Sequence, residues 1–182
     1  ALIYTGGYPI DGLPESFAFI GRGSFMGLQT PIWVMLIVFF VAYLFLDKTP
    51  IGRYSYAIGG NEQSAKLMGL PVARTKVMVY GFNGLCSVLA GVSYALYVKS
   101  GWNLALQGAE LDVISCCVIG GVMLSGGVGY MQGTMLGVLL KATIPAIITF
   151  NGSMNSWWAK IFTGLLLLLF IVIQRAVVAS SA

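Results

Sequence analysis

The chain has 182 residues, of which 58% are hydrophobic and only 9% are charged, with ten basic and six acidic side chains. A typical globular protein carries about 25% charged residues, so this composition excludes a soluble domain and indicates that lipid surrounds most of the chain. The net charge of +4 is small and scattered, which argues against a nucleic-acid-binding surface. There is no histidine, and the commonest metal ligand and proton shuttle is therefore missing.

The first 30 residues are predicted to lie outside the membrane. They contain six glycines and few periodic apolar positions, with one short interfacial helix expected near Glu15–Ile20. They also lack the charged start and compact apolar core of a cleavable signal peptide. The chain begins at Ala1 without an initiator methionine, as expected of a fragment.

Long uncharged runs predict membrane-spanning helices in the rest of the chain. A bilayer core of about 30 Å needs roughly 20 helical residues. The apolar runs place a first span at residues 31–46, a second at 77–98, two more within 113–150 and a last one at 157–174. The expected fold is an all-α integral membrane protein with about five transmembrane segments, one of them short and glycine-interrupted.

The basic residues predict the orientation. Loop 47–76 holds five of the ten basic side chains, so the positive-inside rule makes it cytoplasmic. Residues 1–30 then lie outside, residues 31–178 form the transmembrane region, and residues 179–182 form a cytoplasmic tail.

The cytoplasmic loop contains a short segment with signals for both ends of a helix. Asn61 is a favourable N-cap and Glu62 suits the first turn, while Gly69 can take the left-handed position that ends a helix and Pro71 prevents its continuation. The helix between them, from Glu62 to Met68, is too short to be stable alone in water. It is either a docking element for a cytoplasmic partner or an ordinary connector.

The stretch "GGVMLSGGVGYMQGTMLG", residues 120–137, is rich in glycine but does not fit a phosphate-binding loop. The dipeptide Gly-Lys, which a P-loop needs, occurs nowhere in the chain, and the spacing does not match G-x-G-x-x-G. The later glycines recur every four residues, would line one face of a helix and would let a neighbouring backbone approach: Gly129, Gly133 and Gly137.

The earlier glycines of this stretch are expected to end a span that starts at Val113 after about 13 residues, short of the hydrocarbon thickness. They are Gly120, Gly121, Gly126 and Gly127. A short, interrupted helix is tolerated where it lines protein or water, which points to a transport pathway. Close helix packing alone is the alternative.

Few charged or reactive groups lie near the apolar runs. Glu110 and Asp112 precede the short segment, where they could cap a helix, bond sugar hydroxyls or contact a neighbouring subunit. Lys141 lies in the middle of the fourth span and requires water or a partner. The three cysteines lie in apolar runs and are expected to be small buried residues rather than a disulfide framework: Cys86, Cys116 and Cys117.

Two long stretches resemble a known family. "GRYSYAIGGNEQSAKLMGLPVARTKVMVYGFNGLCSVLAG" and "GAELDVISCCVIGGVMLSGGVG" resemble the C-terminal half of the permease subunit of carbohydrate ABC importers, the ribose-type group. The ending "NGSMNSWWAKIFTGLLLLLFIVIQRAVV" is most similar to galactofuranose permeases. The resemblance covers about residues 17 to 178 and lacks the family's N-terminal half, so this chain alone is not expected to form a complete pathway.

The resemblance implies a subunit that moves a monosaccharide such as galactofuranose or ribose across the bacterial inner membrane. Its partners would be a cytoplasmic ATPase pair, a second permease, a periplasmic sugar-binding protein and membrane lipid, and ATP and magnesium would bind the ATPase, with no cofactor in this chain. The short cytoplasmic helix would fit a cleft on the ATPase, with coupling residues Gly60, Asn61, Glu62, Ala65, Lys66, Met68 and Gly69.

The sugar path would need polar groups that match hydroxyls, because sugars are neutral. Asn83, beside glycines of the second span, and Glu110 at the outer rim are candidates, together with the glycines that interrupt the short span. One alternative is half of an ion-driven secondary transporter, which would want carboxylates inside the membrane. A membrane enzyme would need catalytic groups that the chain lacks, whereas a purely structural subunit stays open.

Overall fold

The computed structural model describes residues 10–11, 21–25, 27–102, 105–151 and 156–180. The regular secondary structure of the described part is helical apart from four two-residue strands, as expected of an all-α membrane protein. Its contacts divide the chain into two compact units, Ala1–Ser55 with Gly69–Gln107 and Tyr56–Met68 with Gly108–Ala182. The interfacial helix expected near Glu15–Ile20 lies outside the described residues.

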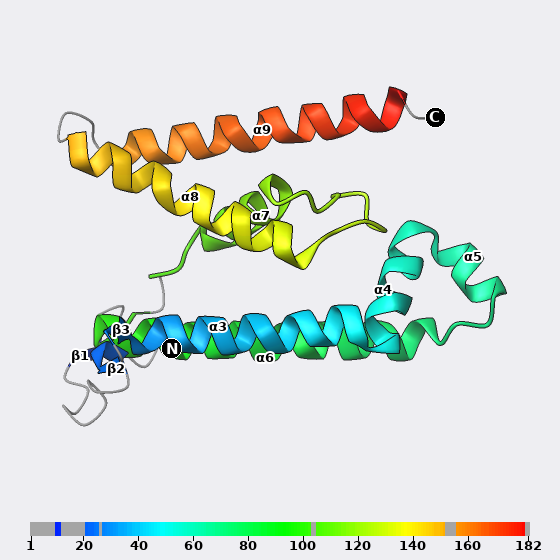
Figure 1. Ribbon diagram of the computed structural model, residues 1–182, viewed down its shortest axis with the longest axis horizontal. Helices are drawn as coiled ribbons and strands as arrows, with labels where there is room; N and C mark the ends of the chain where they lie inside the picture. Colours follow the sequence, from blue (N-terminus) through cyan, green and yellow to red (C-terminus); the bar gives the residue numbers. More distant parts are fainter. Residues whose placement is uncertain (1–9, 12–20, 26, 103–104, 152–155, 181–182) are drawn as a thin grey trace. The chain divides into compact units, whose positions relative to one another are not determined.

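The first unit is built on two long apolar helices. Helix α3 (Thr30–Tyr43) continues as a π-helical stretch, η1 (Leu44–Lys48), and packs against α6 (Val72–Val98) (Figure 1). The rings of Phe45 and Phe82 stack between them, with centroids 4.4 Å apart. Pro31 lies in the first turn of α3, where its missing N–H is not needed.

Short strand pairs lie at one end of this unit. Strand β1 (Ile10–Asp11) pairs antiparallel with β4 (Ser100–Gly101), and β2 (Ser24–Phe25) pairs with β3 (Leu28–Gln29). The Arg22 guanidinium donates to the Tyr97 carbonyl over 2.9 Å and lies over the same residue's ring. These contacts attach the segment before α3 to the end of α6.

The second unit is a three-helix packing. Helices α7 (Ala109–Ile119), α8 (Met131–Asn151) and α9 (Ser156–Ser180) all contact one another (Figure 1). Helix α7 has 11 residues, which makes it too short to cross a bilayer core. The short, glycine-terminated segment predicted from the sequence is therefore present.

Several boundaries differ from the expected spans. Helix α6 begins at Val72 rather than 77, and α9 continues to Ser180, past the expected end at 174. The basic loop also contains a helix that was not expected, α4 (Pro50–Gly60), which is followed by α5 (Glu62–Leu67). Pro50 at the first position of α4 was the signal for it.

Two of the described helical segments, Thr30–Lys48 and Val72–Val98, are long and apolar enough to cross a membrane, and Met131–Ile147 and Ile161–Gln174 are shorter apolar segments. The number of spans, and hence the predicted orientation of loop 47–76, stays a prediction.

Candidate functional site

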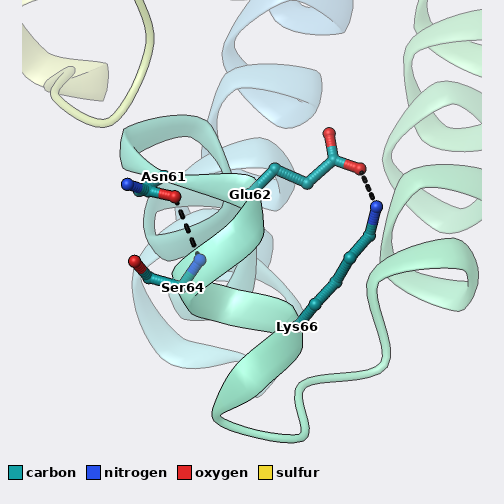
Figure 2. Close-up of polar contacts among 4 residues, drawn as sticks. All are labelled: Asn61, Glu62, Ser64 and Lys66. Carbon is teal, nitrogen blue, oxygen red and sulfur yellow. Dashed lines mark hydrogen bonds and ion pairs between the residues drawn. The ribbon is translucent and has the colours of Figure 1, made fainter.

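Helix α5 is closed at both ends by the residues that the sequence indicated. The Asn61 backbone is extended, and its side-chain oxygen accepts a hydrogen bond from the Ser64 amide over 3.0 Å (Figure 2). Glu62 and Lys66, one turn apart, form a 2.8 Å ion pair. At the other end Gly69 takes a left-handed backbone angle, φ +75°. The caps fix where this six-residue helix begins and ends.

The exposed face of α5 differs from the one expected. Ala65 is fully buried, with 0% of its surface exposed, so its side chain packs inside the protein and its role in coupling stays a prediction. The apolar residues on the outside are Leu67, 89% exposed, and Met68, 67% exposed. Leu67 was not selected from the sequence, although a leucine at the end of an otherwise polar short helix is a signal for a contact surface.

Helix α7 ends in a pair of backbone hydrogen bonds around Gly121. Gly121, at φ +87°, donates to the Val118 carbonyl, and the Val122 amide donates back to the Cys117 carbonyl, each over 3.0 Å. This pair of bonds is a Schellman motif, in which a left-handed residue just beyond the helix satisfies its last carbonyls. The break at Gly120–Gly121 is therefore a regular, hydrogen-bonded helix end.

Gln174 of α9 supports the same helix end from outside. Its side-chain Nε2 donates to the carbonyls of Val118 and Val122, over 3.3 and 3.2 Å. In an apolar environment, a backbone carbonyl that accepts no hydrogen bond raises the free energy of the folded state. Gln174 was not predicted from the sequence, although a glutamine near the end of a leucine-rich run was a signal for such a role.

The glycines of α8 bring its backbone against α7. A Cβ placed on Gly133 would overlap the Gly120 carbonyl oxygen, and one on Gly137 would overlap the Cys116 carbonyl oxygen. Gly129 does not share this face, because α8 begins at Met131; a Cβ there would meet the Val122 side chain at an ordinary 3.4 Å. The expected row of three glycines is therefore a pair.

Gly126 and Gly127 lie in the turn between α7 and α8. Both have left-handed backbone angles, φ +88° and +81°. The turn is closed by two 3.0 Å hydrogen bonds, from the Gly126 amide to the Met123 carbonyl and from the Met123 amide to the Val128 carbonyl. A side chain at either glycine would be strained.

Lys141 finds a partner in Asp112. Its Nζ lies 2.7 Å from Asp112 Oδ1, and the two side chains are 16% and 59% exposed. The pair joins the first turn of α7 to the middle of α8, which gives the otherwise costly cation of the fourth span a counter-charge. Both residues were singled out from the sequence, but their pairing was not predicted.

Replacing Lys141 with methionine is expected to lower the stability of the full-length protein by about 1–3 kcal/mol, because a charge-assisted bond is lost. The cost is below the roughly 3–5 kcal/mol of a fully buried pair, since Asp112 is partly exposed. Thermal unfolding in detergent measures it. The exchange Lys141→Asp with Asp112→Lys should recover part of the loss, whereas Glu110→Gln, on the same turn, serves as the control. Equal melting of all variants would contradict a role for the pair.

The two candidate sugar-binding residues lie on separate units. Asn83 is exposed on α6, where its backbone carbonyl accepts a 2.9 Å hydrogen bond from the Ser87 hydroxyl. Glu110 is exposed in the first turn of α7.

The three cysteines are free thiols, and of these only Cys116 is buried: Cys86, Cys116 and Cys117. Within the described residues, no cluster of three or more acidic or cysteine side chains could hold a metal ion.

Comparison with known proteins identifies the family. Residues 3–171 match the family described as "Branched-chain amino acid transport system / permease component". The chain is 39% identical to the ribose import permease protein RbsC of Bacillus subtilis over 96% of its length, and 36% identical to the L-arabinose transport system permease protein AraH of Escherichia coli, also over 96%. It is 43% identical over 85% to the inner membrane ABC transporter permease protein YjfF of Escherichia coli.

These alignments cover 54%, 53% and 45% of the three relatives, so the chain spans about half the length of the curated relatives that it matches. No solved structure matches the chain significantly. All three relatives are named as permeases rather than enzymes, in agreement with the sequence-based prediction of a transport subunit. The chain therefore belongs to this permease-component family, within which it is grouped with the carbohydrate ABC importers of the ribose type.

Proposed function

We propose that this chain is the C-terminal part of a permease subunit that moves a monosaccharide, such as galactofuranose or ribose, inward across the bacterial inner membrane. The observation that carries the proposal is the similarity to ribose and arabinose permeases along 96% of the chain. The protein crosses the membrane several times, with residues 1–30 in the periplasm and loop 47–76 in the cytoplasm. A periplasmic sugar-binding protein delivers the substrate, and a second permease subunit completes the pathway.

Helix α5 is the part that binds the ATPase. Its capped ends give it a fixed shape, and the exposed Leu67 and Met68 supply an apolar surface that a cleft on another protein can cover. Four of the other five residues of α5 are polar. The proposed coupling set is Gly60, Asn61, Glu62, Ala65, Lys66, Met68 and Gly69, to which the exposed Leu67 is added. ATP and magnesium bind the partner chain.

The interrupted helix α7 borders the sugar path. A helix that ends inside the membrane with its carbonyls satisfied by the Schellman bonds and by Gln174 can border a pathway without exposing unbonded backbone to lipid. Asn83 and Glu110 are the polar side chains assigned to hydroxyl recognition. These two groups can donate to or accept from a neutral sugar without demanding a charged one.

The ion-driven alternative is less well supported by the geometry. A transporter of that class would use carboxylates inside the membrane to carry protons or bind sodium. Asp112, the carboxylate closest in sequence to the apolar part of α7, forms an ion pair with Lys141. A carboxylate held by a lysine is a poor carrier for a second cation, so the pair favours the ATP-driven mechanism.

The full-length protein, reconstituted in vesicles with its ATPase and sugar-binding protein, tests the proposal. We expect uptake of at least one labelled sugar among galactofuranose, ribose and arabinose to require ATP and to be insensitive to a protonophore. Omitting the ATPase is the control. Uptake that follows an imposed proton or sodium gradient without ATP would support the ion-driven alternative and would refute this one.

A further inference from the structure

Two pairs of glycines bring two distant backbones into direct contact in the second unit. Gly59 and Gly60 form the end of α4, and Gly126 and Gly127 lie in the turn after α7. A Cβ on Gly126 would be 2.6 Å from the Gly59 carbonyl oxygen, and one on Gly127 would be 2.8 Å from the Gly60 Cα. A Cβ on Gly59 would be 2.8 Å from the Gly127 nitrogen. A side chain at Gly59, Gly126 or Gly127 would therefore overlap the opposite backbone, whereas a Cβ on Gly60 would make an ordinary 3.8 Å contact with the Gly127 Cα.

The contact is joined stiffly to helix α5 on one side. Gly60 directly precedes Asn61, whose amide donates to the Ala57 carbonyl of α4 over 3.2 Å. The Asn61 carbonyl in turn accepts from the Ala65 amide over 3.0 Å, and the Asn61 side chain caps α5. Asn61 is therefore hydrogen-bonded to both α4 and α5, which connects α5 to the glycine pair at the end of α4.

On its other side the contact is joined to the end of α7. The Met123–Val128 turn that carries Gly126 and Gly127 is closed by its two backbone hydrogen bonds. It follows directly on Val122, whose amide closes the Schellman motif and whose carbonyl accepts from Gln174. The turn is therefore connected through Val122 to the helix end that borders the proposed path.

We propose that the contact of Gly59–Gly60 with Gly126–Gly127 transmits movement of α5 to the end of α7, and so couples ATP hydrolysis on the partner chain to opening of the sugar path. The inference rests on the proposed function. Glycine suits such a role because two backbones that touch directly have no side-chain rotamers between them to absorb a displacement. Closely packed interfaces pass on small shifts rather than deforming continuously.

Close packing during folding is the competing explanation for the four glycines, and the two make different predictions. If the contact only holds the fold together, widening it lowers assembly, ATP hydrolysis and uptake together. If it transmits movement, the complex still assembles and hydrolyses ATP, but hydrolysis no longer drives uptake.

The test is Gly59→Ala in the full-length permease, assembled with its ATPase and sugar-binding protein in vesicles. Gly59 is helical, so alanine favours α4 itself, while its methyl group presses on the Gly127 backbone. We expect at least about a tenfold fall in sugar uptake, with the amount of complex and its ATP hydrolysis unchanged. Gly164→Ala in α9, where a Cβ meets nothing within 4 Å, is the matched control and should keep all three.

Two results would overturn the proposal: wild-type uptake by Gly59→Ala, or a parallel loss of complex, hydrolysis and uptake. Hydrogen exchange of the unsubstituted complex tests the proposal without any variant. The exchange rates of the backbone amides of residues 123–128 should change when a non-hydrolysable ATP analogue binds the ATPase. Unchanged exchange there would also overturn it. Failure of the proposed function is separately recognisable, since the wild-type complex would then show no ATP-dependent uptake.

Discussion

Replacing Gly133 with alanine is expected to separate α8 from α7 and to abolish stable folding of the permease. The added methyl group would overlap the Gly120 carbonyl oxygen, which belongs to a backbone fixed by the Schellman motif. Overpacking of this kind costs typically about 1–3 kcal/mol and more where the neighbour cannot move. Leucine at the same position should be worse. Recovery of folded full-length protein after heating in detergent, followed by size-exclusion chromatography, measures the effect.

Gly129→Ala is the matched control, because its Cβ would meet only the Val122 side chain at 3.4 Å. This variant should keep the wild-type recovery. Gly129 and Gly133 belong to the same four-residue repeat in the sequence, but only Gly133 contacts the α7 backbone. A difference between the two variants therefore comes from that contact and not from membership of the repeat. Wild-type recovery of Gly133→Ala, or equal losses in both variants, would contradict the packing described for α7 and α8.

Replacing Leu67 with lysine is expected to uncouple the permease from its ATPase. Leu67 is 89% exposed at the last position of α5, and a lysine there suits the helix dipole, so the helix itself should persist. A central apolar contact is worth about 2 kcal/mol or more at an interface, which corresponds to roughly 30-fold weaker binding. Co-purification of the ATPase and ATP-driven sugar uptake should both fall, while insertion into the membrane should not.

Leu67→Met keeps an apolar side chain of similar size and should retain uptake, which makes it the control for the lysine variant. Equal uptake by the two variants would refute docking through this surface. Ala65→Arg, the substitution that the sequence alone would suggest, tests something else. Because Ala65 is buried, an arginine there would disturb the packing of α5 before any partner binds.

Features that depend on neighbours in the sequence were predicted well. The caps of α5 at Asn61 and Gly69 follow from backbone groups that bond within a few residues. The early end of α7 at Gly120–Gly121 is equally local, since a left-handed glycine is enough to stop a helix. The apolar runs that became α3 and α6 reflect composition alone. Helix α4 was missed because three of its eleven residues are glycine, a weak helix former, although Pro50 at its first position was a signal for it.

Contacts between distant residues were decided only by the tertiary structure. The sequence contained Lys141 and Asp112, but their pairing required α7 and α8 to lie side by side. The burial of Ala65 depends in the same way on what covers α5, which its own six residues do not determine. The approach of Gly59 to Gly126 joins segments far apart in the chain. Hydrophobic runs and capping residues determine where each helix starts and ends. The packing of whole helices against one another determines which of their faces are in contact.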